Sequence, residues 1–421
     1  MQSCTAAKLL MFAALSAAAG VHAQGSEGGL AADDLAREPL PKLPRDRTYV
    51  LDASLERVRQ SFSIPGMAIG IVENGEAVYV RAFGVRDLET DEPVTVHTAF
   101  HVASISKTFT TAAVMQLMEQ QRMTLDAPIA RYVPAFANSS ITSSITIAQL
   151  LTHSAGLQDI AYRSADADGG DVTQYVAGLA EHGLAYPPGE GWEYSDAAFN
   201  LLGAAVETIT QTDYPRHLQE HVLARAGMHE STFAAPTPGS DIAWPHTGKV
   251  FVRRDSRYPW QRAALPSSGL NASISDMTRW AALHVNRDPV LLSPASYQAM
   301  FQPRVDSSWE GIAMGLGWQL EKRGEDWLPR HPGQEHGFST LVTLYPRQRR
   351  AIVILSNAET TPRGEIRKLI ESVLDTGSYV TPQPPLLLRF NSPWLMAGFA
   401  ALAMLLIGMT VRVFRRRGAR H

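Results

Sequence analysis

Apolar, β-prone runs lie near both ends of the chain, and this placement constrains the fold more than any other feature. Residues 64–72 and 77–83 flank Asn74-Gly75, a strong signal for a two-residue hairpin turn. Residues 339–345 and 351–356 predict a second hairpin, with its turn between them. Strands from both ends predict one antiparallel sheet that the two ends of the chain assemble together.

The sequence between the two hairpins is mainly helical. Residues 108–118 carry apolar side chains at helical spacing, and about 115–266 are expected to form a helical insertion beside the sheet. Residues 315–320 are expected to add a partner strand, and residues 365–374 predict a terminal helix with one apolar face. The predicted class is therefore α/β of the α+β type, an antiparallel sheet flanked by terminal helices.

The N-terminal residues resemble a secretory signal. Lys8 precedes an apolar stretch at 9–20, and Val21-His22-Ala23 has the pattern of a cleavage site. The stretch is short for a membrane span, so an uncleaved anchor is the less favoured alternative. Residues 1–23 are interpreted as a signal peptide and 24–47 as a flexible lead-in rich in Gly, Pro and charge.

The C-terminal residues predict a membrane anchor. Residues 394–411 carry no charged side chain, would be about 27 Å long as a helix, and precede five arginines in the tail 412–421. A buried terminal helix is disfavoured because this stretch is apolar on every face. The arginines place the tail in the cytoplasm and the folded domain, 48–375, on the periplasmic or extracytoplasmic side. A Pro-rich linker, 376–393, would join domain and span.

Composition excludes several classes of function. The chain has 421 residues and a formal net charge of −3, so no basic bias suggests nucleic-acid binding. Its one cysteine, Cys4, lies in the predicted signal, so the mature protein can form no internal disulfide and has no thiol nucleophile.

Ser104-Ile105-Ser106-Lys107 is the candidate catalytic motif. A Ser-x-x-Lys spacing at the start of a helix places the hydroxyl and the ammonium on one face. The unpaired N–H groups and the dipole of a helix N-terminus favour the oxyanion of an acyl-transfer intermediate. Of the chain's lysines, Lys107 alone has a serine three residues before it.

Other hydrolase motifs are absent from the sequence. It contains no Gly-x-Ser-x-Gly, so an α/β-hydrolase elbow is excluded. His229-Glu230 is not followed by a histidine at zinc-ligand spacing, and no phosphate-binding glycine loop occurs. No metal and no organic cofactor is expected.

With these residues placed, the chain from about Thr48 to Leu374 resembles the serine β-lactamase and penicillin-binding protein superfamily. The similarity is to the class C β-lactamase branch with its esterases and D-amino-acid peptidases. The motifs that carry it are Ser104-x-x-Lys107, Leu150 to Leu157, Pro187-Pro188-Gly189, Tyr194-Ser195-Asp196, Leu201-Leu202-Gly203, His331-Pro332-Gly333 and Gly337-Phe338.

Tyr194 matches the tyrosine of the family's tyrosine-x-asparagine motif, but this chain has Asp196 in place of the asparagine. Free lysine and tyrosine both titrate near 10, so neither is a base at neutral pH without help. A lysine ammonium favours the phenolate, and Asp196 would keep Lys107 charged. We therefore expect Tyr194 to act as general base, with Lys107 as its electrostatic partner.

His331-Pro332-Gly333 stands where the family carries lysine-threonine-glycine, just before the strand expected near Phe338. A histidine is only partly charged near neutrality, although Arg330 could compensate. The resemblance makes the backbone N–H of Gln334 the second oxyanion donor, opposite that of Ser104. His153, in a helix expected to end at Gly156, is interpreted as a packed structural histidine.

The sequence thus predicts an exported, membrane-tethered serine hydrolase that forms an acyl-enzyme on Ser104. Asp196 and His331 favour esters, amides or D-amino-acid peptides of the cell envelope as substrates. One alternative is a true class C-type β-lactamase or a DD-peptidase. Another is a penicillin-binding sensor or scaffold without turnover. The expected partners are a small-molecule or peptide substrate and, through the C-terminal helix, the membrane.

Overall fold

The structure, a computed structural model, describes residues 43–136, 144–159, 172–237, 239–248, 251–379 and Pro382. The predicted signal 1–23, the predicted span 394–411 and the basic tail 412–421 lie outside these residues. Among the helices that the structure does describe, none combines the length and the apolar character needed to cross a bilayer.

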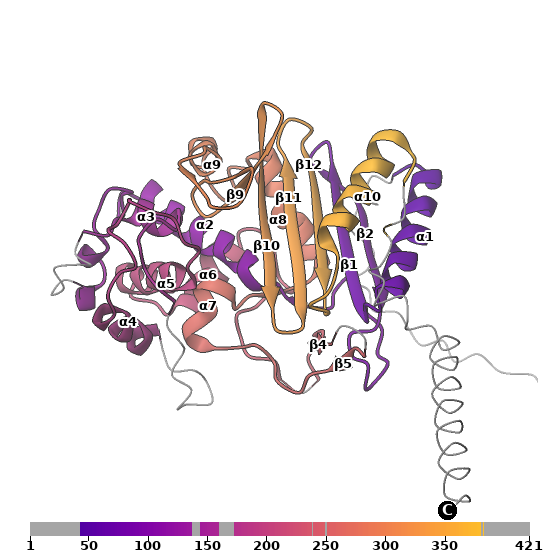
Figure 1. The fold of residues 1–421 in the computed structure, drawn as a ribbon, viewed down its shortest axis with the longest axis horizontal. Coiled ribbons are helices and arrows are strands. Elements are labelled where there is room, and N and C mark those ends of the chain that lie inside the picture. The colour runs from indigo at the N-terminus through magenta and orange to yellow at the C-terminus, as the bar shows by residue number, and fades with distance from the viewer. Residues whose placement is uncertain are drawn as a thin grey trace, which may run out of the picture. The chain divides into compact units, whose positions relative to one another are not determined.

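An eight-stranded antiparallel sheet has the order β2-β1-β12-β11-β10-β9-β8-β7 (Figure 1). Two hairpins from opposite ends of the chain meet where β1 pairs with β12, with Met67 opposite Ser356. The expectation of one antiparallel sheet built from both ends is confirmed. Its strands are β1 (Gly66–Glu73), β2 (Glu76–Gly84), β7 (Val305–Asp306), β8 (Ile312–Met314), β9 (Gln319–Arg323), β10 (Asp326–Glu335), β11 (Phe338–Tyr345) and β12 (Arg350–Ser356).

Glycine and asparagine determine two of the turns in this sheet. Asn74 and Gly75 both have positive φ, 54° and 87°, as a tight turn between twisted antiparallel strands requires. The partner strand expected at 315–320 is wrong in its bounds, because Gly317 has φ 68° and reverses the chain there. Two short strands, β8 and β9, form on either side of that reversal.

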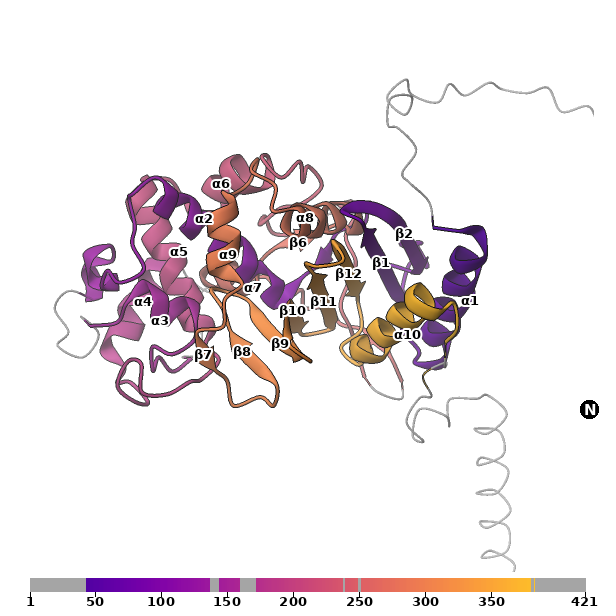
Figure 2. The ribbon, with the colours of Figure 1, turned by 90° about the horizontal axis from the view of Figure 1, so that it is seen from above.

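Helices cover both faces of the sheet. Figure 2 shows α10 on one face and α8 on the opposite face. The side chains of β1 alternate accordingly: Met67 and Ile69 belong to the apolar cluster with α1 and α10, and Ala68 belongs to the cluster with α8. The long helices are α1 (Arg45–Ser61), α2 (Ser106–Glu119), α4 (Val172–Glu181), α5 (Asp196–Thr210), α8 (Ile274–Asn286) and α10 (Arg363–Thr376).

Short elements complete the described chain. The short α-helices are α3 (Ile147–Leu151), α6 (Tyr214–Leu218), α7 (Leu265–Ser268) and α9 (Pro294–Met300). The 3₁₀ turns are η1 (Ala103–Ile105), η2 (Ile129–Arg131), η3 (Pro134–Phe136) and η5 (Arg262–Ala264), and η4 (Gln219–Leu223) is a π-helical turn. Two separate strand pairs are β3 (Phe100–His101) with β6 (Asn271–Ala272), and β4 (His246–Thr247) with β5 (Arg253–Arg254).

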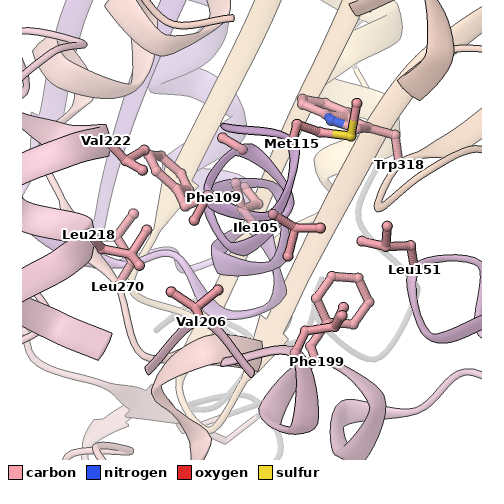
Figure 3. Packing of buried hydrophobic residues seen from close by; sticks show 14 of the residues in the cluster. Ile105, Phe109, Met115, Leu151, Phe199, Val206, Leu218, Val222, Leu270 and Trp318 are labelled. Atoms are coloured by element: carbon pink, nitrogen blue, oxygen red, sulfur yellow. The ribbon is translucent and has the colours of Figure 1, made fainter. Parts of the chain in front are cut away.

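Helix α2 runs through the core of the helical part of the molecule. Its residues from Ser106 to Leu117 are all buried, so it packs against neighbours on every side. The ring of Phe109 stacks on Trp280 at 3.9 Å between centroids, and Figure 3 shows Val206 and Leu218 packed around the same helix. A helix held this tightly fixes the position of whatever its N-terminus carries.

Two helices have other bounds than the sequence predicted. The helix expected to end at Gly156 ends earlier, at Leu151, because Thr152 already leaves helical geometry. Helix α1 begins at Arg45, inside the segment interpreted as a flexible lead-in.

Candidate active site

Ser104 lies in the 3₁₀ turn η1, directly before α2 rather than in its first turn. The preceding Ala103 has φ 51°, a conformation that non-glycine residues rarely adopt. Ser106 holds the turn: its hydroxyl donates to the carbonyl of Ala103 at 2.7 Å and accepts the N–H of Leu270 at 3.0 Å. A strained backbone fixed by neighbouring hydrogen bonds is typical of a functional site.

Lys107 is fully buried, and its ammonium donates to three acceptors. Its Nζ lies 3.2 Å from Ser104 Oγ, 2.5 Å from Asp196 Oδ1 and 3.0 Å from the carbonyl oxygen of Ser267. Burial is the largest single influence and lowers the pKa of Lys107, but Asp196 and Tyr194 together outweigh it and raise that pKa above its ordinary value. Lys107 is therefore a permanently charged donor, as expected from Asp196.

The loop before α5 presents Tyr194 to this lysine. Ser195 caps the helix, its Oγ accepting the N–H of Ala198 at 3.2 Å. Asp159 reinforces the cap, since its carboxylate accepts from the Ser195 hydroxyl at 3.0 Å and from the N–H of Ala197 at 2.8 Å. The Lys107 ammonium consequently lies 4.8 Å from the centroid of the Tyr194 ring.

The protonation of Tyr194 differs from the sequence-based expectation. Loss of water on burial raises the pKa of the phenol, and Asp196 raises it further. Lys107 and Ser104 lower that pKa, but by less than burial raises it. The resting tyrosine is therefore a neutral phenol, not the phenolate that the lysine alone would favour.

His153 contributes more to the site than sequence reasoning assigned to it. Its ring is buried and stacks on Tyr194 at 4.4 Å between centroids, and its Nδ1 accepts the N–H of Ser195 at 3.1 Å. Burial and the nearby Lys107 hold its pKa well below the ordinary value, so the ring is neutral. The sequence signal was the His153-Ser154-Ala155-Gly156 stretch, but only the folded chain shows that it supports Tyr194.

His331 lies in the middle of β10, one strand before the strand expected near Phe338, and it is fully buried. Burial and the repulsion of Lys107 lower its pKa to about 3, so it carries no charge near neutrality. Its Nδ1 lies 2.9 Å from the carbonyl of Pro332, and its Nε2 has no partner among the described residues. Arg330 does not compensate for the missing charge, because it pairs with Glu321 at 2.6 Å.

Gly333 allows β10 to pass close to the turn that carries Ser104. A Cβ at this position would lie 2.3 Å from the Val102 carbonyl oxygen and 3.2 Å from the Ala103 Cβ, so a larger residue would push the two apart. Thr340 joins β11 to the start of the Ser104 turn, because its hydroxyl donates a hydrogen bond to the Val102 carbonyl at 2.8 Å.

The register of the β10–β11 hairpin determines where the Gln334 N–H points. Glu335 and Phe338 close the hairpin around a two-residue turn, so they form a hydrogen-bonded pair. Gln334 faces Ser339 in the next, non-hydrogen-bonded pair, and its N–H therefore points away from β11. The pairing of β9 with β10 ends at Arg330, which leaves that edge open beside the Ser104 turn.

The structure thus brings Ser104, Lys107, Tyr194 and Asp196 together, with Gly333 against the Ser104 turn. A hydroxyl, a fixed ammonium and a neutral phenol in contact are the groups that acyl transfer to a serine requires. Within the described ranges, no three His, Cys, Asp or Glu side chains are grouped so that they could hold a metal ion.

Comparison with known proteins identifies one family. The model of the Beta-lactamase family matches residues 51–374. Protein flp of Staphylococcus aureus (strain MW2) is 26% identical over 347 residues, which cover 78% of this chain and 66% of that protein. Penicillin-binding protein 4* of Bacillus subtilis (strain 168) is 26% identical over 335 residues, which cover 74% of this chain and 73% of that protein. The chain thus spans just under two thirds of the staphylococcal relatives.

Solved structures share the fold. An octameric penicillin-binding protein homologue from Pyrococcus abyssi superposes with a TM-score of 0.70 at 23% identity, covering 81% of this chain and 80% of that one. A class C beta-lactamase superposes with a TM-score of 0.68 at 22% identity, covering 79% and 97%.

Proposed function

Because the chain belongs to the beta-lactamase family, we propose that it is a serine hydrolase that forms an acyl-enzyme on Ser104. The observation that carries the proposal is the hydrogen bond between Lys107 Nζ and Ser104 Oγ, with the ammonium held by two further acceptors. A buried cation in contact with the hydroxyl stabilises the negative charge that develops on the oxygen during attack.

Tyr194 transfers the protons in the proposed mechanism. Ser104 Oγ attacks the substrate carbonyl carbon to form a tetrahedral intermediate, and the phenol of Tyr194 accepts the serine proton and donates its own to the leaving atom. The bond between the acyl carbon and that atom then breaks, which leaves the acyl group on Ser104. This sequence needs no resting phenolate, which agrees with the raised pKa of Tyr194. In the second half, water attacks the acyl carbon, its proton passes through Tyr194, and Ser104 Oγ regains its hydrogen.

The backbone N–H groups of Ser104 and Gln334 would stabilise the oxyanion. The support is the open edge of β10 beside the Ser104 turn and the register that points the Gln334 N–H away from β11. Such donors act on the charge of the tetrahedral intermediate, not on the substrate carbonyl alone.

Esters are the favoured substrates, with D-amino-acid peptides of the cell envelope next and β-lactams last. His331 is neutral and buried, so it supplies no positive charge to a substrate carboxylate. Asp196 pairs with the Lys107 ammonium at 2.5 Å, so that cation is already neutralised and adds no net positive charge for one. Both features disfavour substrates with a carboxylate close to the scissile bond.

A second candidate, hydrolysis of carboxylate-terminated peptides as a DD-peptidase performs it, is favoured by Arg363. Its Nη1 donates to the Gly333 carbonyl, to Gln334 Oε1 and to Ser339 Oγ, each at 2.7 or 2.8 Å. These acceptors are neutral, and among the described residues no carboxylate pairs with this guanidinium. A substrate carboxylate could therefore find a cation near Gln334.

We also propose that the enzyme is exported and tethered to the membrane by residues 394–411. The support is the sequence alone: the predicted signal at 1–23 and the uncharged stretch followed by arginines. Cells expressing the full chain should retain it in the membrane fraction after alkaline carbonate washing. A chain ending at Thr376 should be released, and release of both forms would contradict the tether.

Intact-mass spectrometry tests the acyl-enzyme. The full chain in detergent is mixed separately with a fluorophosphonate, a penicillin and p-nitrophenyl butyrate, beside Ser104→Ala and the exposed control Ser144→Ala. We expect a fluorophosphonate adduct and ester turnover in the wild type and the control, and neither in Ser104→Ala.

The penicillin arm separates the alternatives. Little penicillin adduct alongside ester turnover supports the esterase, and rapid penicillin turnover would show a true β-lactamase. A stable penicillin adduct would indicate a peptidase or a sensor without turnover. No adduct with any probe would contradict the catalytic proposal and leave a scaffold.

A further inference from the structure

Two tryptophans lie near the catalytic tyrosine, one of them in contact with its ring, and the mechanism above does not use them. The ring of Trp309 lies 5.7 Å from that of Tyr194 and 4.8 Å from that of Trp192, centroid to centroid. Trp192 precedes Tyr194 in the loop before α5, whereas Trp309 comes from the β7–β8 loop. Sequence reasoning gave neither a role, because only the fold brings these loops together.

Trp309 is presented by a loop with its own hydrogen bonds. The Ser307 hydroxyl donates to the Ile312 carbonyl at 2.7 Å and accepts the Trp309 N–H at 3.1 Å, and the Ile312 N–H donates to the Trp309 carbonyl at 3.1 Å. The backbone around Trp309 is therefore ordered without help from its side chain. The indole is not needed to form the loop.

Trp309 is nevertheless left partly in water. It is 41% exposed, one of few large apolar side chains this exposed in the described part of the chain. Exposing an indole forfeits much of the free energy that its burial would contribute. An exposed indole next to a reactive phenol offers a surface on which a planar apolar group can stack.

We propose that Trp309 and Trp192 form a subsite for a planar apolar leaving group of the substrate. This rests on the proposed function, in which Tyr194 donates its proton to the leaving group. The leaving atom must then lie within hydrogen-bond reach of the Tyr194 hydroxyl. A ring attached to that atom comes within reach of the indole that lies 5.7 Å from the tyrosine ring. The enzyme would therefore prefer aryl esters over alkyl esters of the same acid.

Two butyrate esters test this subsite with the acyl group held constant. p-Nitrophenyl butyrate carries an aromatic leaving group, and 2,2,2-trifluoroethyl butyrate carries an activated leaving group without a ring. In the full chain, Trp309→Ala should lower kcat/KM for the aryl ester by about 10-fold, mainly through KM. It should change kcat/KM for the trifluoroethyl ester by less than about 2-fold.

Two further variants serve as controls. Trp309→Phe keeps a ring and should retain most of the preference for the aryl ester. Phe251→Ala removes another exposed aromatic side chain, 71% exposed and outside this cluster, and should change neither ester.

An equal loss with both esters in Trp309→Ala would overturn the subsite, because the indole would then act only through Tyr194. No loss with either ester would overturn it as well. Fluorophosphonate labelling of Ser104 in each variant separates these outcomes from failure of the proposed function. Labelling in Trp309→Ala without an ester-specific effect contradicts the subsite alone, whereas no labelling of the wild type contradicts both.

Discussion

The Lys107 ammonium is a full charge placed where water cannot reach it. Three acceptors replace the water: Ser104 Oγ, Asp196 Oδ1 and the Ser267 carbonyl. Only Asp196 among them carries a compensating charge, and it remains 38% exposed while the lysine is fully covered. The charge state of the lysine therefore depends on one carboxylate.

Asp196→Asn should move the alkaline limit of activity to lower pH. The wild-type pKa of Lys107 is raised because Asp196, followed by Tyr194, outweighs the lowering effect of burial. Without the carboxylate, burial dominates and the pKa falls, so the ammonium is lost as the pH rises through a lower value. We expect the alkaline limb of kcat/KM for p-nitrophenyl butyrate to shift downward by at least about one pH unit.

The matched control for that measurement is Glu190→Gln, which removes an exposed acid from the loop before α5. It should leave the alkaline limb unchanged. An unchanged limb in Asp196→Asn as well would mean that the ammonium does not depend on this carboxylate.

Some of the site could be predicted from single residues and some could not. The spacing of Ser104 and Lys107 predicted that they share a face, and they lie within 3.2 Å. The neutral state of His331 was not predictable, because it depends on burial by segments far away in sequence. The same holds for Tyr194, whose pKa reflects lost water more than its charged neighbour.

At the scale of elements, Glu321 joins β9 to both β10 and α10. Its carboxylate accepts from Arg330 at 2.6 Å and from two nitrogens of Arg367, both at 2.8 Å. Burial raises the pKa of Glu321, but the two guanidinium groups outweigh it and lower the pKa from 4.5 to about 2. The cluster fixes α10 against the strand that carries His331.

Glu321→Gln should destabilise the fold by about 3 kcal/mol at pH 7, because it removes the carboxylate that Arg330 and Arg367 share and leaves Arg367, among the described residues, only its longer pair with Glu371, at 3.4 Å. The folded pKa lies below the unfolded one, so the wild-type carboxylate contributes its full stability above about pH 5 and loses it as the pH falls toward about 2. The difference in the free energy of unfolding between variant and wild type should therefore decrease by about 2 kcal/mol from pH 5 to pH 3.

Urea denaturation at several pH values measures this difference, with Glu325→Gln, an exposed acid of the β9–β10 turn, as the control. The control should match the wild type throughout. A difference for Glu321→Gln that stays constant from pH 7 to pH 3 would contradict the ion-pair account.

Elements were predictable where the pattern was regular. Both hairpins came from continuous apolar, β-prone runs and the terminal helix from helical periodicity, and all three are confirmed. The strand expected near Phe338 is β11, whereas β10 was not predicted at His331-Pro332-Gly333, since proline and glycine usually interrupt strands. Here Pro332 lies on an open edge, opposite Leu341 in a pair that needs no N–H, and Gly333 is required by the adjacent turn.

For the whole folded unit, the two ends of the domain depend on each other. Helices α1 and α10 share one apolar cluster on the sheet, and Arg47 Nη1 donates to the Leu374 carbonyl at 2.7 Å. The unit should therefore unfold in a single transition, because neither end buries its apolar face without the other.

Leu51→Ala tests this dependence. Leu51 is fully buried in that cluster, so its loss should cost about 3 kcal/mol through lost burial and the cavity left behind. Urea denaturation followed by fluorescence and by circular dichroism should give coincident, shifted transitions. Tyr49→Ala, which changes a side chain on the same helix that is 76% exposed, should hardly shift the urea midpoint. Two separate transitions in Leu51→Ala would show that the ends unfold independently.

The pairing of Met67 with Ser356 has a consequence for the order in which the molecule can be made. The ribosome releases β1 long before β12. The hairpin of β1 and β2 therefore lacks its β12 partner while almost the whole domain is synthesised. Contacts between residues so far apart in sequence make folding slow, because the entropy of closing a long loop is lost before the contacts can stabilise the chain. A nascent chain that stops short of β12 would carry Ser104 and Lys107 but no finished sheet. Activity would therefore arise only once translation has passed the last strand.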